Sequence, residues 1–290
     1  MPTARSVVAV TLASSSWSLS LSGWLDQAWS RAERGLRRGE GAPHSLSHSL
    51  VLLPVAHIRQ FRGELDAAQD LAQKLISLGQ EQRFVFYEMS GSLTHGCILI
   101  QQRKPEEGIA LITAGLAAYR ATHSGIYLPY FLSFLAGGYL QLGKTAEGMK
   151  AVQEALHLTE VNLDRFWEAE VYRIKGELVL QSGVRGSESQ KESQKSKVKG
   201  QKSKVTNSRP LTPDPQGEAE ACFHKAIEIA RQQGAKSLEL RTVMSLSRLW
   251  QQQGKQHEAH ELLSEIYGWF TEGFNTKDLQ EAKTLLEELV

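Results

Sequence analysis

Residues 129–155 read PYFLSFLAGGYLQLGKTAEGMKAVQEA and contain one complete unit of a pattern that runs through the chain. From Leu132 to Tyr139, apolar or small residues follow the i, i+3, i+4 and i+7 spacing of one helix face. Gly143 then suits a helix end, because glycine tolerates the left-handed backbone conformation found there. A second apolar stripe begins at Gly148. The segment therefore predicts two helices joined by a tight turn.

Small residues recur at intervals of 40 along the chain, and a fixed period of this kind predicts a solenoid of stacked units. The first ladder contains Ser16, Ala56, Gly96, Ala136 and Gly176, and Ser247 follows after 71 residues, which is 40 plus 31. A second ladder contains Ala28, Ala68, Gly108, Gly148, Ala219 and Ala259. A third, expected at turns, contains Gly23, Gly63, Arg103, Gly143, Gly183 and Gly254. Bulky side chains would wedge paired helices apart, so the first two ladders predict close helix pairs.

The unit resembles the tetratricopeptide repeat, a helix-turn-helix of 34 residues, although its period here is longer. One set of matching positions is Leu135, Ala136, Tyr139, Gly143, Gly148 and Val152; another is Leu246, Ser247, Trp250, Gly254, Ala259 and Leu263. We expect an all-α protein, a right-handed α-solenoid of about six tetratricopeptide-like hairpins with a C-terminal capping helix. The expected hairpins span 6–38, 44–78, 83–121, 127–159, 164–233 and 236–270, and the capping helix spans 276–289.

Longer phrases sharpen the resemblance, for example EAEVYRIKGELVL at residues 168–180. The chain resembles the C-terminal helical-repeat region of bacterial predicted ATPases, many of which carry an adenylate or guanylate cyclase domain. Related repeats occur in maltose-activator-type transcription regulators. In that family the ATPase and cyclase modules precede the repeats, so the resemblance implies the function of the repeat region alone. The abrupt start in a helix also leads us to expect that other segments once preceded it.

The repeats divide into 1–183 and 217–290, separated by an insert at 184–216. The insert reads VRGSESQKESQKSKVKGQKSKVTNSRPLTPDPQ and contains eight Lys or Arg, three Asp or Glu and no aromatic residue. Such a segment buries too little apolar surface to offset the entropy lost on ordering, so we expect disorder and low complexity. A basic arm for nucleic acid is the alternative, but without aromatic residues to stack on bases we favour a solvated loop.

Composition favours a cytoplasmic protein. The 33 basic and 32 acidic residues give a net charge of +1, so no overall field favours nucleic acid or an anionic membrane, and neither is expected as a partner. Two cysteines in different repeats form no disulfide framework. No uncharged apolar run reaches the roughly 18 residues of a membrane-spanning helix. The residues after Arg5 resemble a short signal peptide, but they also fit the repeat register, which favours a first helix.

Motifs that suggest chemistry have simpler explanations. Residues 138–145, GYLQLGKT, match the phosphate-loop pattern, but they lie on a helix stripe and its turn, whereas a phosphate loop lies between a strand and a helix. His44 and His48 are four residues apart and His257 and His260 three, without a third ligand. We therefore predict no catalytic residue, no cofactor and no metal, and we expect that the protein is not an enzyme.

A partner is expected on the concave side, which the first helix of each hairpin lines in tetratricopeptide-like stacks. The leading hypothesis is a non-catalytic protein-protein interaction or scaffold module that binds a protein partner or its own copy. It would be the regulatory repeat region of an ATPase/cyclase-type signalling protein. The alternative is a small-effector-sensing regulatory domain of a multidomain ATPase or transcription regulator. The candidate partner-binding residues are Tyr130, Ser133, Gln141, Glu170, Arg173, Glu177, Arg241, Met244 and Arg248.

Overall fold

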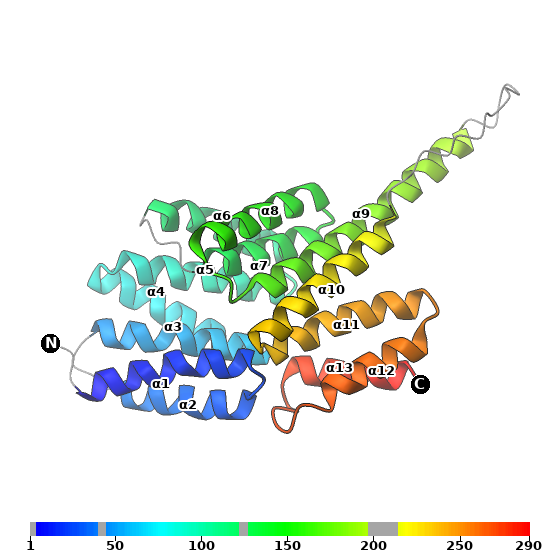
Figure 1. The fold of residues 1–290 in the computed structure, drawn as a ribbon. Helices are drawn as coiled ribbons and strands as arrows, with labels where there is room; N and C mark the ends of the chain where they lie inside the picture. The colour runs from blue at the N-terminus through cyan, green and yellow to red at the C-terminus, as the bar shows by residue number, and fades with distance from the viewer. Residues whose placement is uncertain (1–3, 40–44, 122–126, 197–213) are drawn as a thin grey trace, which may run out of the picture.

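The protein folds as an all-α solenoid (Figure 1). The computed structural model describes residues 4–39, 45–121, 127–196 and 214–290, and these form thirteen helices and no strand. The first three hairpins are α1 (Ala4–Leu21) with α2 (Leu25–Gly39), α3 (Ser45–Arg62) with α4 (Leu65–Gln82), and α5 (Val85–Gln101) with α6 (Pro105–Ala121). The next three are α7 (Leu128–Gln141) with α8 (Thr145–Asn162), α9 (Glu168–Ser196) with α10 (Pro215–Gln233), and α11 (Lys236–Gln252) with α12 (Gln256–Tyr267). Helix α13 (Lys277–Glu288) follows.

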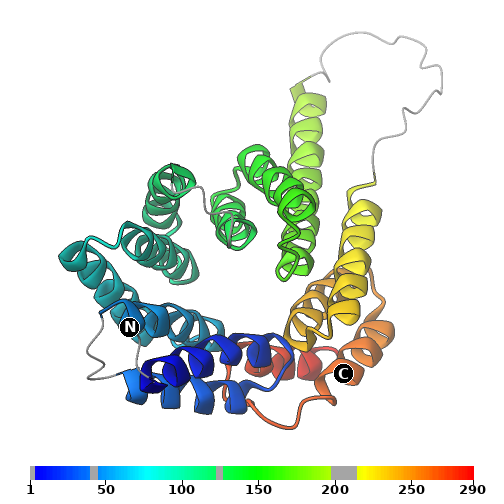
Figure 2. The ribbon, with the colours of Figure 1, turned by 60° about the vertical axis from the view of Figure 1, so that its left-hand side comes forward.

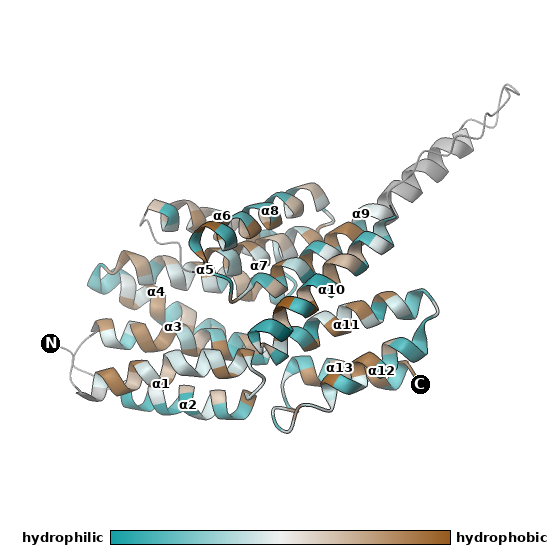
Figure 3. Ribbon diagram, viewed as in Figure 1, coloured by the Kyte–Doolittle hydropathy of each residue, from teal (hydrophilic) through white to brown (hydrophobic). Residues whose placement is uncertain are grey.

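The predicted solenoid of about six hairpins and a closing helix is confirmed. Each helix packs against the next one in the chain, and the first helices of neighbouring hairpins also meet. Every helix carries both hydrophobic and hydrophilic residues (Figure 3). In α4 the buried residues Ala68, Leu71, Ala72 and Leu75 follow the i, i+3, i+4, i+7 spacing of an amphipathic helix. The stacking of such faces produces a large core that runs through the hairpins, with a small second cluster of Ala68, Ala72 and Ile98 between α4 and α5.

The two small-residue ladders face each other inside the hairpins. A Cβ atom built at Gly108 would lie 2.6 Å from the carbonyl oxygen of Gly96, and one built at Gly96 would lie 3.0 Å from that of Gly108. In the last hairpin Ser247 occupies the same ladder position, and its hydroxyl donates to the carbonyl oxygen of Ala259, at 3.3 Å. The helices are thus close enough for their backbones to touch, as the ladders predict.

The turn ladder is confirmed at five of its six positions. Gly23, Gly63, Gly143 and Gly254 have φ between 67° and 94°, and Arg103 takes the same left-handed conformation at φ 63°. Gly183 is the exception, because α9 continues through it to Ser196. A turn at Gly183 was therefore a wrong prediction.

Helix α9 also occupies residues 184–196 of the predicted insert, contrary to the disorder expected there. A Cβ atom at Gly183 would lie 2.5 Å from Pro215 at the start of α10, so the two helices run side by side at this point. The disorder predicted for the rest of the insert falls on residues 197–213, outside the described residues.

The solenoid closes on itself, which the sequence analysis did not predict. In Figure 2 the N-terminal hairpin lies beside the C-terminal helices, and the hairpins follow one another around a ring. We call residues 268–276 the closing loop. Its Glu272 carboxylate accepts hydrogen bonds from the backbone amides of Asp26 and Gln27 at the start of α2, at 3.1 and 3.2 Å. The Asp26 carboxylate in turn accepts from the amide of Gly273 at 3.0 Å.

Aromatic and buried polar contacts reinforce this closure. Trp24, before α2, packs on Trp269 of the closing loop with ring centroids 5.3 Å apart. The hydroxyl of Ser237 in α11 donates to the carbonyl oxygen of Ser20 in α1, at 2.7 Å. Arg62 of α3 is buried and donates to the side-chain oxygen of Asn275 in the closing loop, at 3.3 Å. The first and last units therefore share an interface.

Alanine at two helical glycines should change stability in opposite directions. Gly108→Ala places a methyl group against the Gly96 carbonyl and should lower the free energy of unfolding by about 1–3 kcal/mol. The matched control is Gly137→Ala in α7, because a Cβ there meets no atom within 4 Å. This control should raise the free energy of unfolding by about 0.5–1 kcal/mol. Urea denaturation measures both, and equal shifts would contradict the close-packed hairpin.

Removal of the Glu272 carboxylate should weaken the closure. Glu272→Ala deprives two amides at the start of α2 of their acceptor and should cost about 1 kcal/mol of unfolding free energy. Glu265→Ala in α12 is the control, because that exposed side chain has no such partner among the described residues. Thermal unfolding of both variants tests the prediction; a Glu272 variant as stable as the control would contradict the role of this contact.

Candidate functional site: a central cavity lined by the first helices

A cavity of about 230 Å³ lies on the inner side of the ring. Its lining comes from α3, α5, α7, α9, α11 and α13, together with Gly63 in the turn after α3. These are the first helices of hairpins two to six and the closing helix, and no second helix of a hairpin contributes. The cavity therefore lies on the concave side that was predicted from the register of the first helices.

The structure brings most of the predicted partner-binding residues together. Seven of them line this one cavity: Ser133, Gln141, Glu170, Arg173, Arg241, Met244 and Arg248. Glu177 joins them indirectly, because its carboxylate accepts from the hydroxyl of Ser245 in the lining, at 2.7 Å. Tyr130 lies behind the lining and is only 2% exposed. Whether any of these residues contacts a partner stays a prediction.

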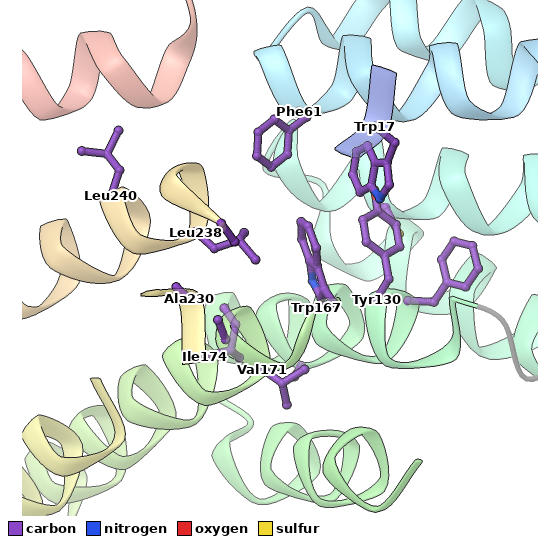
Figure 4. Packing of buried hydrophobic residues seen from close by; sticks show 14 of the residues in the cluster. Trp17, Phe61, Tyr130, Trp167, Val171, Ile174, Ala230, Leu238 and Leu240 are labelled. Atoms are coloured by element: carbon purple, nitrogen blue, oxygen red, sulfur yellow. The ribbon is translucent and has the colours of Figure 1, made fainter. Parts of the chain in front are cut away.

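Tyr130 belongs to an aromatic cluster that fills the interior of the ring next to the cavity. We call Trp17, His57, Tyr130 and Trp167 the aromatic plug. Figure 4 shows Trp17 of α1, Tyr130 of α7 and Trp167 of the turn before α9 lying close together. Trp17 of α1 stacks on Trp167 with ring centroids 5.9 Å apart, and Tyr130 packs on Trp167 at 4.9 Å. The plug therefore joins the first hairpin to the middle of the solenoid and fills part of the concave side with protein.

Hydrogen bonds fix the plug beside the cavity. The Tyr130 hydroxyl donates to Oε1 of Gln60 at 2.8 Å, and the Trp167 indole nitrogen donates to the Ser133 hydroxyl at 2.9 Å. His57 is fully enclosed, and its Nε2 lies 3.0 Å from the Thr94 hydroxyl oxygen. Because that hydroxyl already donates to a backbone carbonyl, His57 is the donor in this pair. Burial lowers the pKa of His57 to about 3.

A buried ion-pair network forms the α9 wall of the cavity. Arg173 donates two hydrogen bonds to the Glu170 carboxylate, at 2.9 and 2.7 Å, and a third to the Ser245 hydroxyl at 3.2 Å. Burial alone would raise the pKa of Glu170, but the positive charges of Arg173 and Arg241 lower it overall. Glu170 is therefore an ionised acceptor that Arg173 already occupies.

Helices α11 and α13 form the adjoining wall. Nε of Arg241 donates to the Asp278 carboxylate at 2.6 Å, and its guanidinium lies 4.2 Å from the ring centroid of Phe61. At the rim, Arg248 and Lys277 share the carboxylate of Glu281, each at 3.7 Å. The rim pairs are half exposed and loose, whereas Arg241 is held on two sides.

Two adjacent glycines of α7 differ in the space available for a side chain. A Cβ at Gly138 would lie 2.9 Å from both Ile100 and Ile109, so packing requires glycine there. A Cβ at Gly137, which lines the cavity, would meet no atom within 4 Å. Glycine inside a helix costs about 0.5–1 kcal/mol relative to alanine. At Gly137 that cost secures no packing contact, and the space in front of the residue is part of the cavity.

Other motifs form no second site. The GYLQLGKT segment is the end of α7, a turn and the start of α8, so it is not the strand-loop-helix of a phosphate loop. Within the described ranges, no three His, Cys, Asp or Glu side chains gather in a way that could hold a metal ion. His44 lies outside these ranges. In the described part of the chain, no helix is long and apolar enough to cross a membrane.

Phe61 and the residues of α13 in the cavity lining were not predicted from the sequence. Phe61 follows Ala56 by five residues, as Gln101 follows Gly96, and both line the cavity, so the ladder register contained this signal. Helix α13 was predicted as a polar capping helix, yet Lys277 and Asp278 face the cavity. No ladder position lies in α13, so the repeat pattern gave no register for it.

Comparison with known proteins adds no assignment. No protein-family model matches the chain, and no curated protein matches it with significance. The resemblance to the ATPase and cyclase repeat region therefore stays a prediction.

The enclosed His57 should make stability fall in acid. Its pKa is near 6.5 in the unfolded chain and about 3 in the folded protein, so below pH 6.5 the unfolded chain binds the proton more tightly. Stability should therefore decline from about pH 6.5 toward pH 3, with about 2–3 kcal/mol lost at pH 4.5 through this group.

The variant His57→Gln separates this effect from the carboxylates that also titrate in acid. The groups facing His57 are Thr94, Trp17, Tyr127, Tyr130 and Phe131, none of which is charged in this pH range. Urea denaturation at pH 7 and pH 4.5 should show a smaller loss in the variant. Equal losses in the two proteins would contradict a neutral, enclosed imidazole.

Proposed function

We propose that this protein is a non-catalytic binding module whose ligand is a small molecule held in the central cavity. The observation that carries this proposal is the open space in front of Gly137, at a helical position where alanine would be more stable. Six helices contribute to the lining, so one ligand would contact five of the six hairpins and the closing helix at once. This favours the small-effector alternative of the sequence analysis.

The size of the cavity supports a small ligand over a protein segment. Ligand sites for small molecules occupy roughly 300–1,000 Å³, and the volume here lies just below that range. The aromatic plug and the closed ring occupy the space in which an open solenoid of this kind would hold a helix or an extended peptide. A ligand that bridges the repeats would stabilise the fold by about 2.7 kcal/mol at a hundred times its Kd.

A protein partner or a second copy is the second candidate, and it would bind outside the ring. Val161 and Leu163, near the turn after α8, are 63% and 76% exposed, and Leu163 has φ 57°, which is unusual for leucine. Exposed apolar side chains of this kind suit a binding surface. The scaffold function and the link to ATPase/cyclase signalling rest on this surface and on the resemblance.

The proposal places the protein in the cytoplasm, because both cysteines are free thiols. Cys97 and Cys222 are buried and unpaired, and burial raises the pKa of each thiol. Unpaired cysteines suit a reducing compartment.

Equilibrium dialysis against a pool of small polar metabolites, followed by mass spectrometry, tests the cavity as the binding site. Wild type and Val85→Phe, a control at an exposed position of α5 outside the cavity, should retain the same compound. Gly137→Phe should not, because its ring fills the cavity while the helix keeps its backbone. If no compound is retained, or if the Phe variant retains it equally, the cavity proposal fails and the outer surface becomes the better explanation.

A further inference from the structure

Arg241 has two donor atoms that the described protein leaves free. Its Nε is bound to Asp278, and one face of its guanidinium lies over Phe61. Neither Nη1 nor Nη2 has a hydrogen-bond partner among the described residues, and neither is among the unpartnered atoms sealed from solvent. Arg241 lines the cavity, so these two nitrogens lie at the cavity surface. A guanidinium fixed in this way presents a planar pair of donors, the geometry that matches the two oxygens of a carboxylate.

The charges around the cavity are divided unequally between its walls. On the α9 wall, Glu170 and Glu177 oppose the single cation Arg173, which is bonded to both directly or through Ser245. The α11 and α13 wall carries three cations, Arg241, Arg248 and Lys277, against two carboxylates, Asp278 and Glu281. Three minus two leaves an excess of one positive charge on this wall, and the α9 wall has the reverse excess of one negative charge, so the positive excess is local to the side where the Arg241 donors are free.

Part of the remaining lining is apolar, which limits the kind of anion; the uncharged polar lining residues are Gln60, Gln101, Ser133, Gln141 and Ser245. Phe134, Ile174 and Met244 border the same cavity, so a ligand can place an apolar body against them. A phosphate would bring about 1.5–2 negative charges into a space that already contains Glu170 and Asp278. One negative charge matches the excess of one positive charge. This inference rests on the proposed function, since it assigns the ligand class of that same cavity.

We infer that the cavity binds a small organic monocarboxylate. Its two oxygens accept hydrogen bonds from Nη1 and Nη2 of Arg241, and its apolar body packs against Phe134 and Met244. Arg248 and Lys277 at the rim, loosely paired with Glu281, attract the anion as it enters.

Isothermal calorimetry with the 290-residue chain at pH 7.5 tests the inference. The probes are straight-chain monocarboxylates from butanoate to octanoate, the corresponding primary amides as uncharged isosteres, and inorganic phosphate. We expect at least one acid to bind about tenfold more tightly than its amide, because hydrogen bonds to a charged group add about 1.5–3 kcal/mol. The same acid should bind more tightly than phosphate.

Variants locate the bound carboxylate. The double variant Arg241→Gln, Asp278→Asn removes both charges of the pair. It should lower the affinity for the acid by about tenfold or more. Arg120→Gln, Glu154→Gln is the matched control, because it neutralises an exposed ion pair between α6 and α8, outside the cavity. Arg241→Lys keeps the positive charge but loses the planar pair of guanidinium donors, so it should also weaken binding of the acid. It provides a second test in case the double variant folds poorly.

The possible results separate this inference from the proposed function. It is overturned if no acid binds, if acid and amide bind equally, if phosphate binds better, or if the Arg241 variants keep the affinity. If a neutral compound binds and Gly137→Phe blocks it, the cavity remains the ligand site and only the carboxylate assignment fails. If nothing in the panel or the metabolite pool binds in the cavity, both fail.

Discussion

The contact on which this structure depends is the backbone-to-backbone approach of the two helices in a hairpin. At Gly96 and Gly108 the helices are so close that a single methyl group would collide with a carbonyl oxygen. Equivalent ladder positions are buried in all six hairpins. Each unit buries its apolar face against the next, so the close helix-helix approach inside one hairpin is repeated along the stack. The curvature of the ring, and so the width of its interior, follows from that repetition.

Closure of the ring converts a curved surface into a cavity. The aromatic plug joins α1 to α7 and α9 through Trp17, Tyr130 and Trp167, and the closing loop ties the start of α2 to the C-terminal helices through Glu272. These contacts leave a small polar space between the first helices and α13. Protein encloses the buried pair of Arg173 and Glu170 on several sides. Glu170 therefore relies on the positive charge of Arg173 to lower its pKa against the effect of burial.

The sequence predicted local features well, because the repeat records them. The hairpins, most of the turns and the residues of the concave side could all be found from the 40-residue period, including Arg173, Arg241 and Met244. Ring closure could not be predicted, because Asp26 and Glu272 lie 246 residues apart and belong to no ladder. For the same reason Tyr130 was expected to face a partner, whereas Trp17 from the first hairpin covers it. At Gly183 a glycine suggested a turn, but the chain continues there as α9 and lies close to Pro215 of α10.

The shared interface between the first and last units also constrains how this protein can change over evolution. An open solenoid can gain or lose a unit, since each one touches only its neighbours. Here the amides of Asp26 and Gln27 must meet the carboxylate of Glu272, which fixes the number of hairpins that fit between them. A duplicated or deleted repeat would separate the two ends and break the cavity. Substitutions that spare these contacts would leave the ring intact.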